Sequence, residues 1–239
     1  MEHKLTWYGH SNFKLETENK QTFVFDPFFT GNPSAPVDAA VIKRADAVLI
    51  THDHDDHIGQ AIEICQSTGA HCVGVFDTIK KLTGQGLPDN GIGMNVGGTV
   101  MVGETSIHMV QAVHSTASGV ATGYILTLND GLCLYHAGDT GLFSSMELFG
   151  LFNTIDVALL PIGGWFTMGP EHAAYACKLL KCQKVIPMHW GTFPILEQNT
   201  KPFANALERM APDTGLVPME PGQTISIRKE NDNLQCSCE

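Results

Sequence analysis

The sequence predicts an α/β fold in which two similar layers pack sheet to sheet, with helices on the outside. Short strand-like runs alternate with helix-like segments along the whole chain. The same order, early hairpins and then strand–helix units, occurs roughly once in each half. No Ser/Pro-rich linker or low-complexity tract separates the halves. We therefore expect one domain over residues 1–239, with similar halves at roughly 1–110 and 111–239.

The individual elements are predicted from periodicity and turn chemistry. Residues 129–131 (Asn-Asp-Gly) favour positive φ and predict a hairpin between two of the strands. A helix is expected from Pro170, because Gly169 can cap it and proline suits the first helical position. The expected strands are residues 4–8, 22–25, 46–51, 71–76, 107–113, 121–128, 132–136, 156–161 and 184–188. The expected helices are residues 58–67, 77–84, 143–152, 170–182 and 202–210.

Composition and charge restrict the class of partner. The chain has 239 residues, of which 43% are hydrophobic and 16% charged, so it can bury a substantial core. It carries 25 acidic against 14 basic residues, for a formal net charge of −11. Polyanions are attracted by clustered Lys and Arg, so this balance argues against nucleic acid and anionic membranes as partners. A small-molecule substrate fits better, and the sequence leaves open whether the protein is a homo-oligomer.

Cysteine usage indicates a reducing compartment. The chain has seven cysteines, an odd number, and five of them stand singly in apolar or helical contexts. Cys236 and Cys238 form a C-x-C pair that we interpret as a frayed tail with two free thiols; a metal or redox site there is the alternative. The N-terminus has no apolar signal region and no segment reaches eighteen apolar residues. We expect a soluble cytoplasmic protein.

The segment LITHDHDDHIGQ, residues 49–60, places three histidines and three aspartates at six consecutive positions directly after an apolar strand. Loops at the carboxyl ends of strands are where α/β proteins build their sites. In an extended loop His52 and His54 can converge on one ion, while Asp56 and His57 can point toward a second. Imidazole with carboxylate is a ligand set suited to Zn²⁺, Mn²⁺ or iron.

Three further ligand-type residues follow apolar strands in the same way. His114 comes after IHMVQAV, Asp139 lies in LYHAGDT, and His189 lies in PMHWGTF. Each alone would more often be structural. Their shared position past strands, beside the histidine-rich loop, favours a common metal site.

These motifs carry a resemblance to a known family. The pattern H-x-H-x-D-H, followed by separate His, Asp and His residues, resembles the metallo-β-lactamase superfamily. Flanking segments GHSNF, DPFFTGNP, AGDTG, FTMGPEHAA and PMHWGTF resemble one branch, the small single-domain metal-dependent hydrolases related to the ascorbate-phosphate lactonase group. The match runs from residue 5 to about residue 220. It implies a four-layer αβ/βα sandwich with a dinuclear site along one edge.

The resemblance also implies roles for individual residues. Asp139 would bridge two divalent ions, most simply Zn²⁺, with Mn²⁺ or Fe²⁺ as alternatives, and a hydroxide shared by the ions would attack the substrate. The first ion would be held by His52, His54 and His114, and the second by Asp56, His57 and His189.

Four residues are expected around these ligands. Asp26 could orient a ligand histidine through its second ring nitrogen, and His136 is expected to be structural. Besides Asp56, the candidate catalytic residues are His10, as a donor lining the site, and His172, as a proton donor to the leaving group. His172 departs from the branch, which usually carries Asp there.

The expected site loops contain no Lys or Arg, which a phosphate dianion normally requires. They offer aromatic side chains instead, namely Phe143, Trp165, Phe166, Trp190 and Phe193. We therefore expect a small neutral or weakly anionic ester, lactone or amide as substrate. The alternatives are a phosphodiesterase or nuclease of the same superfamily, an iron-dependent redox enzyme, and a metal-binding sensor without turnover.

Overall fold

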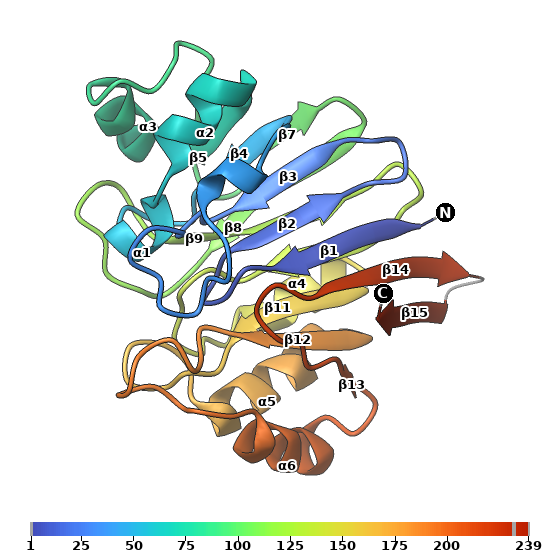
Figure 1. Ribbon diagram of the computed structural model, residues 1–239. Coiled ribbons are helices and arrows are strands. Elements are labelled where there is room, and N and C mark those ends of the chain that lie inside the picture. The colour runs from blue at the N-terminus through green and yellow to red at the C-terminus, as the bar shows by residue number, and fades with distance from the viewer. Residues whose placement is uncertain (1, 231–232, 239) are drawn as a thin grey trace.

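Two β-sheets face each other and helices cover their outer faces in the computed structural model, which describes residues 2–230 and 233–238 (Figure 1). The first sheet has eight strands in the order β15-β14-β1-β2-β3-β4-β5-β6. Its strands are β1 (His3–Trp7), β2 (Phe13–Glu16), β3 (Thr22–Phe25), β4 (Ala47–Leu49), β5 (His71–Val75), β6 (Ile92–Met94), β14 (Thr224–Glu230) and β15 (Asn233–Cys238).

The second sheet has seven strands in the order β13-β12-β11-β10-β9-β8-β7. Strands β10 to β13 are parallel to one another, whereas β7 to β10 form antiparallel pairs, including the hairpin expected at residues 129–131. Its strands are β7 (Thr99–Val102), β8 (Thr105–Gln111), β9 (Thr122–Thr127), β10 (Cys133–His136), β11 (Val157–Pro161), β12 (Lys184–Met188) and β13 (Gly215–Leu216).

The helices form the two outer layers. Helices α2 and α3 pack on the first sheet and α5 packs on the second, beside α4 and α6. The four-layer sandwich is thereby confirmed. The helices are η1 (Ala39–Val41), α1 (Asp55–Ile58), α2 (Ala61–Thr68), α3 (Phe76–Thr83), α4 (Met146–Phe152), α5 (Pro170–Leu180) and α6 (Lys201–Met210).

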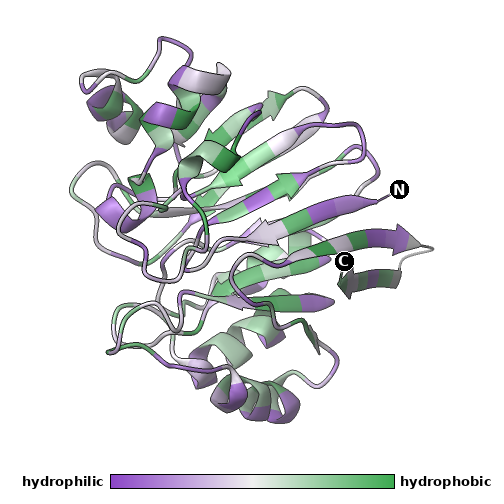
Figure 2. Ribbon diagram, in the orientation of Figure 1, coloured by the Kyte–Doolittle hydropathy of each residue, from purple (hydrophilic) through white to green (hydrophobic). Residues whose placement is uncertain are grey.

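Alternation along the central strands explains this layering. In β3 and β4, Phe23, Phe25 and Leu49 join the large core between the sheets, while Val24 and Val48 join a second core under α2 and α3. Successive strand residues point to opposite faces, so a strand that is apolar at every position needs cover on both sides. Figure 2 shows the hydrophobic strands in the middle and hydrophilic helix surfaces outside.

The sheets divide the chain differently from the expected halves. The crossing to the second sheet falls between Met94 and Thr99, and the C-terminal hairpin β14–β15 returns to the first sheet. The interpretation of Cys236 and Cys238 as a frayed tail is wrong, because both lie in β15 and pair with Ile227 and Ile225 of β14. The segment is short and has few apolar residues, so the sequence gives little sign that it forms a strand. No helix in the described ranges is long and apolar enough to cross a membrane.

The helix expected at residues 58–67 is broken in two. Gly59 adopts φ 42°, which ends α1, and a Cβ at this position would lie 2.2 Å from the carbonyl oxygen of Pro27. Glycine is therefore required where the histidine-rich loop packs against the Pro27 backbone. The short helix α1 that results carries Asp56 and His57.

Candidate metal centre

Loops from both sheets meet at one edge of the sandwich. The histidine-rich loop follows β4, and His114, Asp139 and His189 follow β8, β10 and β12. All seven predicted ligands come together there in overlapping groups whose candidate ligand atoms lie within 4.8 Å of one another. The groups are His52, His54 and His114; His10, Asp56, His57 and His189; and His52, His57 and Asp139.

The first group consists of three imidazoles. Nε2 of His52 lies 2.9 Å from Nδ1 of His54, and the ring centroids of His52 and His114 are 4.9 Å apart. His52 is buried, whereas His54 and His114 are half-buried. Burial, followed by the charge on His57, lowers the pKa of His52 to about 2. The ring is therefore neutral near pH 7, as a metal ligand must be.

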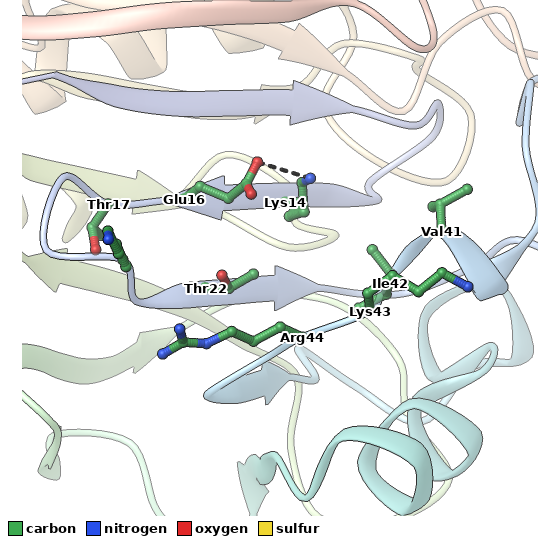
Figure 3. Close-up of a pocket in the computed structure, with 9 residues that line it drawn as sticks. Lys14, Glu16, Thr17, Thr22, Val41, Ile42, Lys43 and Arg44 are labelled. Carbon is green, nitrogen blue, oxygen red and sulfur yellow. Dashed lines mark ion pairs between the residues drawn. The ribbon is translucent and has the colours of Figure 1, made fainter.

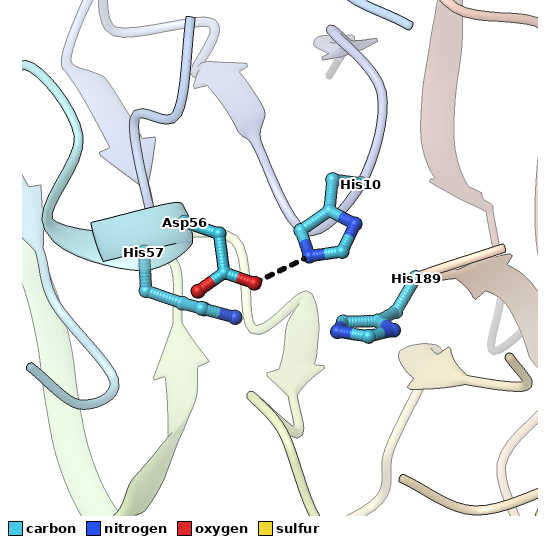
Figure 4. Close-up of side chains that lie close together, drawn as sticks. All are labelled: His10, Asp56, His57 and His189. Carbon is cyan, nitrogen blue, oxygen red and sulfur yellow. Dashed lines mark hydrogen bonds and ion pairs between the residues drawn. The ribbon is translucent and has the colours of Figure 1, made fainter. Parts of the chain in front are cut away.

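The second group is more deeply buried (Figure 4). His57 and Asp56 extend from α1, His189 follows β12, and His10 comes from the turn between β1 and β2. His10, His57 and His189 are at most 2% exposed. Nε2 of His10 lies 3.2 Å from Oδ2 of Asp56, and the rings of His10 and His189 lie 3.9 Å apart. His10 therefore contacts a candidate ligand directly, and its expected catalytic role stays a prediction.

Asp139 lies between the two groups. Its Oδ2 is 3.0 Å from Nε2 of His189, 3.3 Å from Nε2 of His57 and 3.6 Å from Nε2 of His114. Gly138 permits this approach, because it adopts φ 60° and a Cβ there would lie 2.6 Å from the carbonyl oxygen of Thr122. One carboxylate oxygen thus reaches histidines of both groups.

A buried carboxylate behind the groups sets the proton positions on two histidines. Nδ1 of His57 donates to Oδ2 of Asp26 at 2.7 Å, which orients the ring so that Nε2 faces Asp139. Thr51 donates its hydroxyl to the same Asp26 oxygen, so Nδ1 of His52 donates to Thr51 Oγ1 at 3.1 Å. The expected role of Asp26 in orienting a histidine is confirmed, and Thr51 extends it to a second one.

Two unsatisfied atoms indicate that the donor set fits a metal ion. Nε2 of His57 and Oδ1 of Asp139 are buried without a hydrogen-bond partner. Each such atom costs about 1–3 kcal/mol. His57 Nε2 and the Asp139 carboxylate approach each other without hydrogen-bond geometry. Divalent ions would satisfy lone pairs held in this way.

Electrostatics favour positive charge at the same place. Burial opposes ionisation of Asp139, but the charges of His189 and His57 outweigh it, and the pKa of Asp139 falls well below its ordinary value. Burial likewise opposes protonation of His57, yet Asp139 and Asp26 raise its pKa well above 6.5. The negative potential that draws a proton onto buried His57 would equally draw a metal cation.

Backbone strain gathers at the site. Six non-glycine residues of the described chain have positive φ, and four of them, His10, Asp26, Trp165 and His189, lie in the loops of this edge. Such conformations cost about 1–3 kcal/mol each and persist where the surroundings enforce them. The strain is consistent with a functional site.

The remaining sequence expectations have different outcomes. His136 is structural, as expected: its Nε2 donates to the Ser11 carbonyl at 3.0 Å, and its Nδ1 accepts from the Gly138 amide at 3.1 Å. His172 lies exposed in the first turn of α5, outside the groups above, and its catalytic role stays a prediction.

The site opens into a cavity of about 310 Å³. Of the five aromatic residues expected around it, Phe166 lines the cavity and is 55% exposed, while Trp165 is 76% exposed. Trp190 instead packs against Trp7, with ring centroids 5.5 Å apart. The cavity is lined by His54, Asp56, His114, Ser115, Asp139, Phe166 and His189.

Two threonines that hydrogen-bond to histidines of the site were not singled out from the sequence. Thr51 precedes the histidine cluster, and Thr192 lies 3.0 Å from Nδ1 of His10 through its hydroxyl. A threonine has no spacing signal of its own. The position of Thr51 directly before the first ligand histidine was the one available indication.

Known proteins resemble this chain over nearly its whole length. The sequence profile of the Beta-lactamase superfamily domain matches residues 4–189. A UPF0173 metal-dependent hydrolase from Nitratidesulfovibrio vulgaris is 51% identical over 240 residues, covering 99% of this chain and 100% of the relative. Another, from Caldivirga maquilingensis, is 41% identical over 224 residues, covering 93% and 97%.

A solved structure agrees with these sequence relatives. Igni18, described as a novel metallo hydrolase from Ignicoccus hospitalis, superposes with a TM-score of 0.88 at 38% identity. The superposition covers 96% of this chain and 100% of Igni18. With its fold and its histidine and aspartate groups, the chain belongs to the UPF0173 metal-dependent hydrolases of the metallo-β-lactamase superfamily.

Proposed function

We propose that this hydrolase uses two divalent metal ions to cleave a small-molecule ester, lactone or amide. The observation that carries the proposal is the position of Asp139, whose Oδ2 lies within 3.6 Å of histidines from both ligand groups. Seven ligand residues also exceed what one tetrahedral ion can use. The first ion would be held by His52, His54 and His114, and the second by Asp56, His57 and His189, with Asp139 shared.

When bound, the ions would supply Lewis acidity and lower the pKa of water toward ~7, with Zn²⁺ the first choice and Mn²⁺ or Fe²⁺ the alternatives. The chain's own residues orient the ligands. Asp26 holds His57 directly and His52 through Thr51. His10 Nε2 donates to Oδ2 of Asp56, which leaves the other carboxylate oxygen free to coordinate.

His10 acts as a positioning group in this scheme. Burial, followed by the charge on His189, lowers its pKa to about 4, so the ring is neutral near pH 7. Nδ1 then accepts a hydrogen bond from the Thr192 hydroxyl, while Nε2–H donates a hydrogen bond to Asp56. Because both ring nitrogens are engaged, the proton for a leaving group must come from elsewhere, and exposed His172 remains the candidate.

The cavity supports a small substrate of low charge. Its volume of about 310 Å³ is near the lower end for ligand pockets, and no Lys or Arg lines it. Phe166 offers an apolar surface beside the ligands. A phosphate dianion would meet no basic side chain there besides the metal ions.

Four of the basic residues line a different cavity. Lys14, Lys20, Lys43 and Arg44 surround a hollow of about 300 Å³ on the outer side of β2 and β3 (Figure 3). Lys14 pairs with Glu16 at 2.8 Å, and Arg44 lies 3.4 Å from Asp46. This arrangement offers no free clamp for a phosphodiester at the metal centre, so the nuclease alternative has no support from the site.

Metal content and a substrate panel test the proposal. Elemental analysis after reconstitution with Zn²⁺ or Mn²⁺ should give two ions per chain. Turnover of esters, lactones and amides should exceed that of phosphodiesters. One ion or fewer would contradict the dinuclear site, faster phosphodiester cleavage would favour the nuclease alternative, and two ions without turnover of any substrate would favour a sensor.

A further inference from the structure

Asp53 stands between two ligand histidines, but its side chain contacts another part of the molecule. The carboxylate is fully buried and accepts four hydrogen bonds. Its partners are Thr116 Oγ1 at 2.6 Å and the Ala117 amide at 2.7 Å on Oδ1, with Ser118 Oγ at 2.6 Å and Lys81 Nζ at 2.8 Å on Oδ2. In the extended loop, alternate side chains point to opposite sides. His52 and His54 therefore face the metal groups, and Asp53 faces residues 116–118.

Residues 116–118 belong to the loop that carries His114. This loop joins β8 to β9 without regular structure over residues 112–121, and most of its residues are exposed or half-buried. His114 and Ser115 from this loop both line the cavity. A loop with so little apolar burial needs specific hydrogen bonds to keep one conformation.

Helix α3 contributes to the same contact. Lys81 reaches Asp53 from the last turn of α3, and Thr78 Oγ1 lies 3.0 Å from Ser118 Oγ. Lys81 brings a positive charge to one carboxylate oxygen of Asp53, beside the hydroxyl donors of Thr116 and Ser118. An ionised carboxylate with charge-assisted donors forms stronger hydrogen bonds than a neutral acceptor.

We propose that Asp53 is a positioning residue that holds the 114–120 loop so that His114 completes the first metal group. This rests on the proposed dinuclear function, because it requires an ion at His52, His54 and His114. Asp53 thus joins the histidine-rich loop of the first sheet to a ligand loop of the second. Lys81, Thr116 and Ser118 supply the donors that this junction needs.

Stepwise Zn²⁺ affinities, measured against a chromogenic chelator, test the role of the carboxylate. Asp53→Asn should weaken one of the two ions about 10–100-fold, as loss of a group that supports ligands generally does, and leave the other unchanged. His114→Ala should abolish the same ion. Asp55→Asn is the matched control, because it removes the same charge from an exposed side chain two positions away. Wild-type affinities, or equal weakening of both ions, would overturn the proposal.

Hydrogen exchange of the metal-free protein provides an independent readout. Amides of residues 114–120 should exchange faster in Asp53→Asn than in wild type or Asp55→Asn, with Ala117 most affected. Ser118→Ala is a milder variant that should shift the same amides less, should Asp53→Asn fold poorly. Unchanged exchange in both variants would overturn the positioning role. A wild-type protein that binds fewer than two ions would instead overturn the dinuclear function.

Discussion

The two ligand groups are built differently. His57 and His189 are at most 2% exposed, and His57 is fixed by a buried Asp26. His54 and His114 are half-buried, and the His114 loop is held by hydrogen bonds to Asp53 rather than by a packed core. Burial together with the Asp26 hydrogen bond sets the geometry of one group, whereas a polar junction between two loops supports that of the other.

The difference in burial predicts that the two groups release their ions at different rates. A deeply buried group exchanges its ion slowly, because ligand motion requires the core to open. His54 and His114 of the half-buried group line the cavity, as do Asp56 and His189 of the other group. Because His54 and His114 are more exposed, we expect the ion at His52, His54 and His114 to be lost first during chelation.

Removing Asp139 should have the largest effect, because it is the one carboxylate shared by both groups. Asp139→Ala should reduce turnover to background while the metal-free protein keeps its circular dichroism spectrum. The loss of activity is measured as turnover of the best ester or lactone substrate. Asp89→Ala, which removes a carboxylate at an exposed position, is the control. Near-wild-type activity would remove Asp139 from the mechanism.

Removing His172 should slow the step in which the leaving group departs. It should leave metal binding at both groups unchanged. His172→Ala should slow substrates with alkoxide leaving groups about 10²-fold in kcat, as expected for loss of a general acid. Activated aryl esters need no proton donor and should be hardly affected. Equal slowing of both substrate classes would assign His172 a structural role.

Removing the charge of Asp26 should weaken mainly the ion at His57, whereas removing the charge of Asp53 should weaken the ion at His114. Asp26→Asn keeps a residue that tolerates the observed φ of 40° but removes the charge that His57 Nδ1 donates to. The ion at His57 should weaken about 10–100-fold, with a smaller effect at His52 through Thr51. Stepwise Zn²⁺ titration measures both ions. An unchanged affinity for the ion at His57 would show that the buried group does not depend on Asp26.

Acidification of the metal-free protein should reveal the burial of His10. Its pKa is about 4 when folded against 6.5 ordinarily, so below pH 6.5 the unfolded chain takes up a proton that the folded protein does not. Stability must then fall as the pH falls. Between pH 7.5 and 5.5 the wild type should lose about 1 kcal/mol more than His10→Asn, measured by urea unfolding. Equal losses would show that His10 is not a buried neutral group.

The protein should not bind nucleic acid at physiological salt. A net charge of −11 and a cavity without Lys or Arg leave little counterion release to drive binding. Fluorescence anisotropy with labelled single- and double-stranded oligonucleotides at physiological salt should show no change. Micromolar binding with a steep salt dependence would contradict this expectation.

Much of the site could be predicted from the sequence, because its strongest signal is local. The histidine-rich segment needs only its own residues and the preceding strand to indicate a metal loop. Long apolar strands and capped helices such as α5 were predictable for the same reason. Short edge strands were not predictable, because β6, β13 and β15 have few apolar residues, and the strands that pair with β6 and β13 are separated from them in the sequence.

The amino-acid sequence by itself determined the ligand types, the order of strands and helices that carries them, and the absence of Lys and Arg from the loops around them. Only the tertiary structure decided that Asp53 supports His114, that Asp26 reaches His52 through Thr51, and that His10 holds Asp56. These arrangements depend on contacts between residues that are 25 to 65 positions apart in the sequence. Their geometry follows from where two sheets place their loops, which no local pattern of residues encodes.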